Sequence, residues 1–363
     1  MSGVVVLGST GSIGRQTLEV VAAHPDRFEV VGLAAGRGSE GLADQLAAWP
    51  QAMGWCADGR PAEIERSRWA GGGLAELASL DAAEIVVVAT TGMAALPAVL
   101  VALAAGRRVA LANKETLVTG GHLVVAELDR LGGDPLDRLR PIDSEHSAIW
   151  QCLLGERLDS VTRLVLTASG GPFRDRPAAE LAAVTPAEAL AHPTWRMGPK
   201  ITIDSATLVN KAFEAIEARW LYRLPYDSGS YKAQLGLPDM RLPIQYALTY
   251  PERVPSPARH SSPEEWGSLD FGPLEQGQFP AHDTVRQAAA AGGNRGTILN
   301  AADEIAVAAF LAGAIPFLRI GEVIGESVER WADGTEPALE QVIALDAEIR
   351  STLSADLGLG GVA

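Results

Sequence analysis

The chain contains few cysteines, little positive charge and no long uninterrupted apolar run. Its 363 residues include two cysteines, Cys56 and Cys152, which are too few for a disulfide framework or a zinc site built from thiolates. The formal net charge of −15 argues against nucleic acids and anionic membranes as partners, because both require a basic surface. These absences exclude a secreted disulfide scaffold and a nucleic-acid-binding protein.

The most apolar stretch, residues 93–112, does not predict a membrane helix, because Pro97 and the pair Arg107–Arg108 interrupt it. The N-terminus enters an apolar segment without a basic leader or a cleavage site. A content of 47% apolar and 21% charged residues is that of a soluble globular protein, and the length suffices for two or three domains. We therefore expect a cytoplasmic protein without a membrane partner.

A glycine-rich turn near the N-terminus links a β-branched run to an amphipathic segment. Gly8, Gly11 and Gly14 are spaced G-x-x-G-x-x-G, a variant of the dinucleotide fingerprint in which glycines permit a tight turn and a helix N-terminus offers N–H groups to a pyrophosphate. Buried parallel strands alternating with helices are predicted by three later apolar segments, at 28–36, 83–92 and 107–115. The pattern predicts a doubly wound, Rossmann-like α/β domain; a glycine-rich turn of another α/β domain is the alternative.

The end of the second predicted strand indicates which nicotinamide cofactor is used. NAD sites carry an acid there for the ribose hydroxyls, whereas NADP sites accommodate the 2′-phosphate with a basic residue. In this chain the strand runs into Gly36-Arg37-Gly38, and no acid precedes Glu40. Arg37 therefore favours NADPH, with a solvated surface arginine as the alternative.

Two acids stand close together in the segment RPIDSEHSAIWQ, at Asp143 and Glu145. In an extended segment residues i and i+2 point the same way, and two adjacent carboxylates require a cation, a proton or a strong donor. A divalent metal and an acid/base pair are two interpretations. On spacing alone, the favoured interpretation is that Asp143 and Ser144 cap the helix that follows.

A second group of polar residues lies between positions 166 and 220. The segment LTASGGPF, 166–173, predicts a strand and a Ser-Gly-Gly turn that can offer a hydroxyl and amides to an anion. Residues 192–197 read as a loop containing Trp195, and ITID, 201–204, reads as a strand. Asp204 or Ser205 would then cap the next helix.

That next helix carries polar residues beside an apolar stripe. Asn210, Lys211 and Glu214 lie near one another and off the stripe that starts at Val209. A solvated face is the ordinary interpretation, but a helix N-terminus with these groups also suits a phosphate. Glu214 could join Asp143 and Glu145 in an all-oxygen site for Mg²⁺ or Mn²⁺.

These segments together resemble the 1-deoxy-D-xylulose 5-phosphate reductoisomerase family along almost the whole chain. The resemblance rests on seven ordered blocks: GSTGSIG, LANKETLV, PIDSEHSAIWQ, LTASGGPF, HPTWRMGPKITIDSATLVNKAFEAIEARW, AQLGLPDMRLPI and LNAADEIAVAAFL. It implies an enzyme that uses NADPH and Mg²⁺ or Mn²⁺ to rearrange and reduce 1-deoxy-D-xylulose 5-phosphate to 2-C-methyl-D-erythritol 4-phosphate, in non-mevalonate isoprenoid synthesis. It also implies a homodimer.

The resemblance implies a role for each matching position. The metal ligands are Asp143, Glu145 and Glu214, which with Lys114 form the catalytic set. The substrate-binding residues are Lys114, Ser144, Glu145, Ser169, His192, Trp195, Ser205, Asn210, Lys211 and Glu214. The NADPH-binding residues are Thr10, Gly11, Ser12, Ile13, Gly36, Arg37, Asn113, Glu115 and Gly198.

The chain departs from the family pattern at two places. Gly38 stands where some relatives have asparagine, which removes one side-chain contact to the cofactor. The family also carries a segment with a His-Pro-Gln-Ser motif after EARWLY, 217–222, and this chain runs on without it. In the family that segment belongs to the sheet beside the dimer contact. Its absence therefore weakens the expectation of a homodimer and leaves the catalytic positions intact.

We expect an NADPH-binding domain over 1–141, an α/β catalytic domain over 142–255, a linker over 256–282 and a helical C-terminal domain over 283–363. Two other functions remain as alternatives. One is an NADP-dependent dehydrogenase of a metal-chelating hydroxy acid, without rearrangement. The other is a nucleotide-binding regulatory protein whose acids only cap helices.

Overall fold

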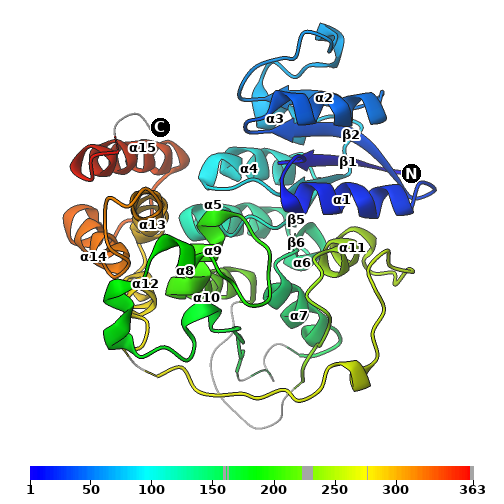
Figure 1. Cartoon of the computed structure of the whole chain (residues 1–363). Coiled ribbons are helices and arrows are strands. Elements are labelled where there is room, and N and C mark those ends of the chain that lie inside the picture. The colour runs from blue at the N-terminus through cyan, green and yellow to red at the C-terminus, as the bar shows by residue number, and fades with distance from the viewer. Residues whose placement is uncertain (158–160, 162, 223–231, 276, 360–363) are drawn as a thin grey trace. The chain divides into compact units, whose positions relative to one another are not determined.

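The computed structural model describes the whole chain except residues 158–160, 162, 223–231, 276 and 360–363 (Figure 1). It divides into two compact units. The sheet unit comprises 1–116, 123–164 and 221–261, and the helical unit comprises 117–122, 165–220 and 262–363. Because the chain passes between the units several times, these boundaries differ from the predicted contiguous domains, and the division into three domains remains a prediction.

The sheet unit is built on six parallel strands in the order β3-β2-β1-β4-β5-β6. The strands are β1 (Ser2–Leu7), β2 (Phe28–Ala35), β3 (Met53–Cys56), β4 (Ile85–Val88), β5 (Arg108–Leu111) and β6 (Leu139–Pro141). Val4 to Leu7 and Ile85 to Val88 are completely buried, as expected for inner strands of a parallel sheet covered on both faces. The doubly wound prediction is confirmed, and the strand order reverses between β1 and β4, where such folds bind ligands.

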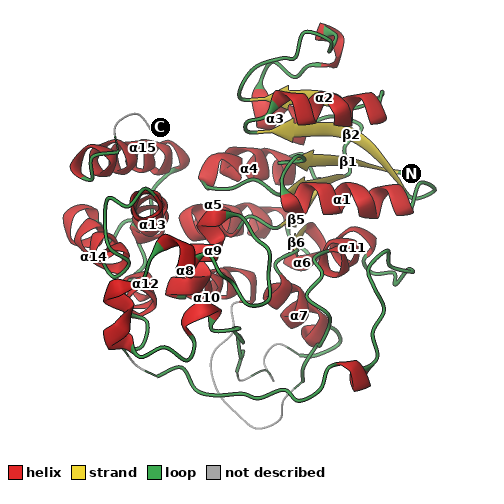
Figure 2. Cartoon of the chain, in the orientation of Figure 1, coloured by secondary structure: helices red, strands yellow, loops and turns green. Residues whose placement is uncertain are grey.

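Helices connect these strands (Figure 2). They are α1 (Ser12–Ala23), α2 (Ser39–Ala48), α3 (Gly73–Ala78), α4 (Leu96–Ala104), α5 (Lys114–Leu131), α6 (Pro135–Arg138) and α7 (Ser144–Leu153), with short 3-10 turns η1 (Arg66–Arg68) and η2 (Met93–Ala95). A helix from much later in the chain, α11 (Arg241–Thr249), packs against α1 and α7. The sheet unit is therefore completed by residues far from the glycine-rich turn in sequence.

The helical unit is organised around α13 (Arg295–Leu311). This helix packs against α14 (Arg319–Trp331), α15 (Leu339–Asp356) and α9 (Pro199–Thr207), and 12 of its residues are buried. The remaining elements are α8 (Pro186–Ala189), α10 (Val209–Tyr222), which ends in the sheet unit, α12 (Pro280–Ala290), and the turns η4 (Gly171–Phe173), η5 (Ala178–Ala183) and η6 (Pro263–Glu265). The helices predicted after residue 283 are present.

Two predicted strands are wrong. Residues 166–169 form no strand, and 201–204 lie inside α9. That helix begins earlier than predicted because Pro199, whose fixed φ suits the first helical position, follows the N-cap Gly198. Asp204 and Ser205 are therefore inside a helix and are not N-caps, and the burial of Thr202 and Ile203 in this helix overrides the β propensity of the segment.

Leu208 interrupts the helical conformation between α9 and α10. Its φ of 57° makes it the only non-glycine residue with positive φ among those described, a conformation that a leucine adopts at a cost. The break turns α10 away from α9 within one residue. Among the helices in the described part of the chain, none is both long and apolar enough to cross a bilayer.

Candidate active site

The glycine-rich turn after β1 has the shape of a pyrophosphate cradle. Gly8 has φ of 88°, and a Cβ on Gly14 would lie 2.2 Å from the Gly8 carbonyl oxygen, so both positions require glycine. In the described first turn of α1, the N-cap Gly11 supplies no side-chain cap and no acid is present. With Ser12 exposed beside it, this helix end suits an anion, as NADPH binding requires.

The residues predicted to read the 2′-phosphate lie just beyond β2. Gly36, Arg37 and Gly38 are exposed, and the Gly38 N–H donates a hydrogen bond of 2.9 Å to Asp58 Oδ2. Asp58, from the loop after β3, is an acid near this position that sequence reasoning missed. Exposure of Arg37 fits both a cofactor contact and a solvated arginine, so its role remains a prediction.

Asn113 holds the loop after β4 to the start of α5. Its Oδ1 accepts from Thr116 N at 2.8 Å as the N-cap, and its Nδ2 donates to the carbonyl oxygens of Thr90 and Gly92 at 3.0 and 2.8 Å. The side chain is buried and uses both amide protons in these bonds. Asn113 therefore shapes the carboxyl edge of the sheet, and a direct contact with NADPH remains a prediction, as it does for the buried Glu115.

Lys114 and Asp143 form a buried ion pair in the sheet unit. The distance from Lys114 Nζ to Asp143 Oδ2 is 2.5 Å, and their side chains are 7% and 10% exposed. Asp143 is also the N-cap of α7, because its Oδ1 accepts from Glu145 N at 3.3 Å. The capping interpretation is thus confirmed. The other carboxylate oxygen, Oδ2, contacts the Lys114 ammonium.

Glu145 does not extend beside Asp143 in a strand-like segment, as the spacing argument assumed. It is the second residue of α7, and its Oε2 accepts a hydrogen bond of 2.5 Å from Ser144 Oγ. The capped first turn of α7 therefore presents two carboxylates and a hydroxyl beside the Lys114 ammonium. Such a set of oxygen donors fits a hard divalent cation.

Glu214 is the most deeply buried of the predicted ligands. It is 0% exposed, its Oε1 accepts from Asn210 Nδ2 at 2.7 Å, and its Oε2 pairs with Lys211 Nζ. The interpretation of these residues as a solvated helix face is therefore wrong. A buried carboxylate is stable only when it is paired and hydrogen-bonded, and the first turn of α10 supplies both kinds of partner.

Ser169 and His192 lie together in the helical unit. Ser169 Oγ is 3.3 Å from His192 Nε2, and it accepts from Gly171 N at 3.2 Å. His192 Nδ1 accepts from the backbone N–H groups of Thr194 and Trp195 at 3.1 and 2.8 Å. Because Nδ1 is an acceptor, the ring proton is assigned to Nε2 and donated to Ser169; burial lowers the pKa of His192 and favours this neutral form.

Ser205 lies near the C-terminal end of α9, against the Ser169 turn. Gly171, with φ of 63°, approaches so closely that a Cβ would lie 2.6 Å from the Ser205 carbonyl oxygen. The chain then passes through Leu208 into the first turn of α10, which carries Asn210 and Lys211. The helical unit thus gathers hydroxyls, an amide and an ammonium, which suit a phosphate.

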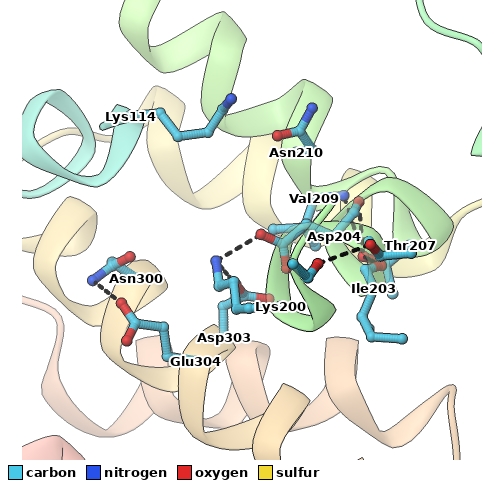
Figure 3. A network of polar contacts seen from close by, with 12 residues as sticks. Lys114, Lys200, Ile203, Asp204, Thr207, Val209, Asn210, Asn300, Asp303 and Glu304 are labelled. Atoms are coloured by element: carbon cyan, nitrogen blue, oxygen red, sulfur yellow. Dashed lines mark hydrogen bonds and ion pairs between the residues drawn. The ribbon is translucent and has the colours of Figure 1, made fainter. Parts of the chain in front are cut away.

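Sequence reasoning missed a buried ion cluster on α9 and α13 (Figure 3). Lys200 Nζ lies 2.6 Å from Asp204 Oδ2 and 2.7 Å from Asp303 Oδ2. Asp204 is 1% exposed and Asp303 is 0% exposed, and this burial raises the pKa of Asp303. The i, i+4 spacing of Lys200 and Asp204 was visible in the sequence, but no local signal connects them with a residue about one hundred positions later.

The features of the two units, described one unit at a time, indicate a class of protein. The sheet unit is a doubly wound dinucleotide-binding fold with its glycine turn at the switch point. The helical unit carries a phosphate-type donor set with a buried acid. A dinucleotide-binding fold and a set of phosphate donors are the features of a nicotinamide-dependent enzyme that acts on a phosphorylated substrate.

Comparison with known proteins gives the family. Sequence models described as 1-deoxy-D-xylulose 5-phosphate reductoisomerase, its C-terminal domain and DXP reductoisomerase C-terminal domain match residues 4–121, 139–222 and 235–352. The enzymes of that name from Thermomicrobium roseum and Thermus thermophilus are 48% and 46% identical over 96% of this chain, and 96% and 98% of theirs. The chain belongs to the 1-deoxy-D-xylulose 5-phosphate reductoisomerase family.

Solved structures agree. The reductoisomerase from Zymomonas mobilis in complex with NADPH is 36% identical, with a TM-score of 0.87 over 98% of this chain and 99% of that one. A DOX-P reductoisomerase structure with NADPH, fosmidomycin and magnesium is 33% identical, with a TM-score of 0.87 over 99% of both chains. The predicted family, α/β fold class and enzyme class are confirmed.

Proposed function

We propose that this protein converts 1-deoxy-D-xylulose 5-phosphate to 2-C-methyl-D-erythritol 4-phosphate, using NADPH and a divalent metal. Within the molecule, Glu214 carries the proposal: it is a completely buried carboxylate in the first turns of a helix, held by an amide and an ammonium. A helix cap or a solvated acid has no need of that environment. The likeness to reductoisomerases over nearly the whole chain supports the same function.

Asp143, Glu145 and Glu214 are the proposed ligands of Mg²⁺ or Mn²⁺. The donor set fits, since all three are carboxylates and none of the ligands is a thiolate or an imidazole. Lys114 neutralises Asp143 and Lys211 neutralises Glu214, so each half of the set is stable before a cation binds. When bound, the metal supplies Lewis acidity to the ketone and hydroxyl oxygens of the substrate.

The phosphate of the substrate is assigned to Ser169, Ser205, Asn210 and Lys211. Their hydroxyl, amide and ammonium donors match the acceptor oxygens of a phosphate, and the Lys211 charge adds strength. His192 fixes the Ser169 hydroxyl by its Nε2 contact. Trp195 is half-buried in the loop whose backbone N–H groups donate to His192. In the proposed function it would cover the substrate and exclude water.

Lys114 and Ser144 are assigned to the reacting end of the substrate. The Lys114 ammonium is held on Asp143 in a largely buried position, so it can stabilise negative charge that develops on a substrate oxygen during the rearrangement. NADPH, when bound, would supply the hydride that reduces the rearranged substrate. Glu145 and Ser144 share a short hydrogen bond, which orients the hydroxyl.

NADPH is assigned to the sheet unit, with its pyrophosphate on Thr10, Gly11, Ser12 and Ile13 and its 2′-phosphate on Arg37. Gly36, Asn113, Glu115 and Gly198 complete the proposed contacts. Use of Mn²⁺ beside Mg²⁺, a homodimer and a cytoplasmic location also belong to the proposal. The dimer rests on the family resemblance, and the point where the family pattern is interrupted falls at 223–231, outside the described residues.

A substrate test separates the three functions. The purified chain should oxidise NADPH only when 1-deoxy-D-xylulose 5-phosphate and Mg²⁺ or Mn²⁺ are both present, and NMR of the product should show the branched methylerythritol phosphate. NADPH oxidation with an unphosphorylated keto acid, but not with this substrate, would establish the simple dehydrogenase. Nucleotide binding without any turnover would indicate the regulatory protein.

A further inference from the structure

We infer that Lys200 is a positioning residue for the substrate phosphate, because with Asp204 and Asp303 it fixes α9 on α13. The inference rests on the proposed function in one respect: the residues that α9 carries are taken to bind phosphate. It does not require that the substrate be deoxyxylulose phosphate.

The position of Lys200 is unfavourable for a cation unless it has a specific purpose. It is the second residue of α9, where the positive end of the helix dipole repels an ammonium. The side chain is only 24% exposed, and Nζ lies between Asp204 Oδ2 and Asp303 Oδ2 at 2.6 and 2.7 Å (Figure 3). It also stands 5.2 Å from the ring centroid of Phe213 on α10. One ammonium therefore joins α9, α10 and α13.

The helix that Lys200 anchors supports the whole phosphate site. Ser205 is on α9, and the Ser169 turn rests on it through the close approach of Gly171 to the Ser205 carbonyl. Leu208 then links α9 directly to the turn of α10 that carries Lys211. A shift of α9 along α13 would therefore move every proposed phosphate donor, but it would leave the glycine-rich turn of the sheet unit unchanged.

The charged side chains of the cluster indicate that it fixes the position of α9 on α13 rather than raising the stability of the fold. Beside Lys200 the α13 face continues into Glu304, whose carboxylate pairs with Arg350 at 2.8 Å; Arg350 also pairs with Asp346 at 2.6 Å. Lys200 and Arg350 are thus the cationic partners in ion pairs with four acids: Asp204, Asp303, Glu304 and Asp346. Buried ion pairs often stabilise a fold no better than apolar residues of similar size, whereas they do fix relative position.

The test compares three variants with the parent full-length protein. Lys200→Met removes the ammonium. Lys200→Met/Asp204→Leu/Asp303→Leu replaces the whole buried cluster of Lys200, Asp204 and Asp303 by apolar side chains, which restores stability but not the directional link. Arg350→Met is the matched control, because it breaks an ion pair between α15 and Glu304 of α13 without touching α9. Thermal melting, KM, kcat and the dissociation constant of inorganic phosphate are measured for each.

We expect Lys200→Met and the triple variant to raise the phosphate dissociation constant and the substrate KM by about tenfold or more, as the loss of one aligned charge-assisted contact does. Because α10 also carries Glu214, kcat should fall as well, whereas the KM for NADPH, most of whose proposed contacts are in the sheet unit, should stay within a few-fold of the parent. The melting temperature should recover in the triple variant while phosphate affinity stays low. Arg350→Met should lower the melting temperature and leave phosphate affinity unchanged.

Two results would overturn the inference. One is recovery of phosphate affinity together with the melting temperature in the triple variant, which would make the cluster purely structural; this result remains interpretable if Lys200→Met alone does not fold. The other is a parent protein that binds no phosphate. Turnover of deoxyxylulose phosphate by the parent tests the proposed function separately, since phosphate binding is measured without it.

Discussion

Replacing Glu214 with glutamine tests the proposed metal site most directly. The change keeps the shape of the side chain and removes one charge from a residue that is completely buried. Glu214 accepts hydrogen bonds at both oxygens, from Asn210 and from Lys211. Glutamine has one acceptor oxygen and an NH₂ group, so it cannot accept from both donors as they now stand, and the Lys211 ammonium loses its charged partner.

The magnitude follows from those two contacts. Loss of a charge-assisted hydrogen bond to Lys211 should lower the free energy of unfolding of the metal-free protein by about 1.5–3 kcal/mol. Loss of a metal ligand should lower kcat/KM by at least about 100-fold, or ~2.7 kcal/mol of transition-state stabilisation. The glycine-rich turn is unaffected, so NADPH affinity should equal that of the parent.

The assay combines steady-state kinetics with thermal melting at increasing Mn²⁺. A cation that binds only the folded protein raises its stability, and this gain should be smaller for Glu214→Gln than for the parent. Glu217→Gln is the control, because Glu217 is another buried acid on α10 with no proposed contact to the metal. A Glu214→Gln enzyme with activity within a few-fold of the parent and normal metal dependence would refute the three-carboxylate site.

Three further predictions concern the cofactor and the loop at 192–198. Arg37→Ala should raise the KM for NADPH by an amount equivalent to about 1.5–3 kcal/mol and leave the KM for NADH unchanged; equal effects on both cofactors would show that Arg37 does not bind the 2′-phosphate. Trp195 fluorescence should change when a substrate analogue binds, since the side chain is half-buried, and an identical spectrum would mean that the loop does not close. The neutral His192 ring accepts two backbone N–H groups, and burial lowers its pKa from the ordinary value near 6.5. The stabilisation of the loop is therefore complete above about pH 6.5 and lost as the pH falls through the lower folded-state pKa; an NMR titration that gives a pKa above the ordinary value would contradict this.

The glycine-rich turn and the sheet around it were predictable from the sequence because their signals are local. A tight turn against a helix start permits only glycine at positions 8 and 14, and strands buried on both faces must be continuously apolar. Asp143 as a helix cap was likewise visible from spacing within a few residues. The ordered motif blocks identified the family for the same reason, since each is a short run whose order along the chain is fixed.

The polar cluster of the helical unit was only partly predictable. Asn210, Lys211 and Glu214 were recognised as neighbours from helical spacing, but the same spacing fits a solvated face. Whether such a face is buried depends on what packs over it in the folded chain, and Glu214 is completely buried.

Tertiary packing alone decided the conformation of ITID and the partner of Lys200. The β-branched residues at 201–204 favour a strand in isolation, but burial against α13 makes them part of α9. Asp303 reaches Lys200 because α13 packs on α9, a contact between segments about one hundred residues apart. The sequence determined those features whose cause lies within a few residues, and the folded structure decided the charges whose partners come from elsewhere in the chain.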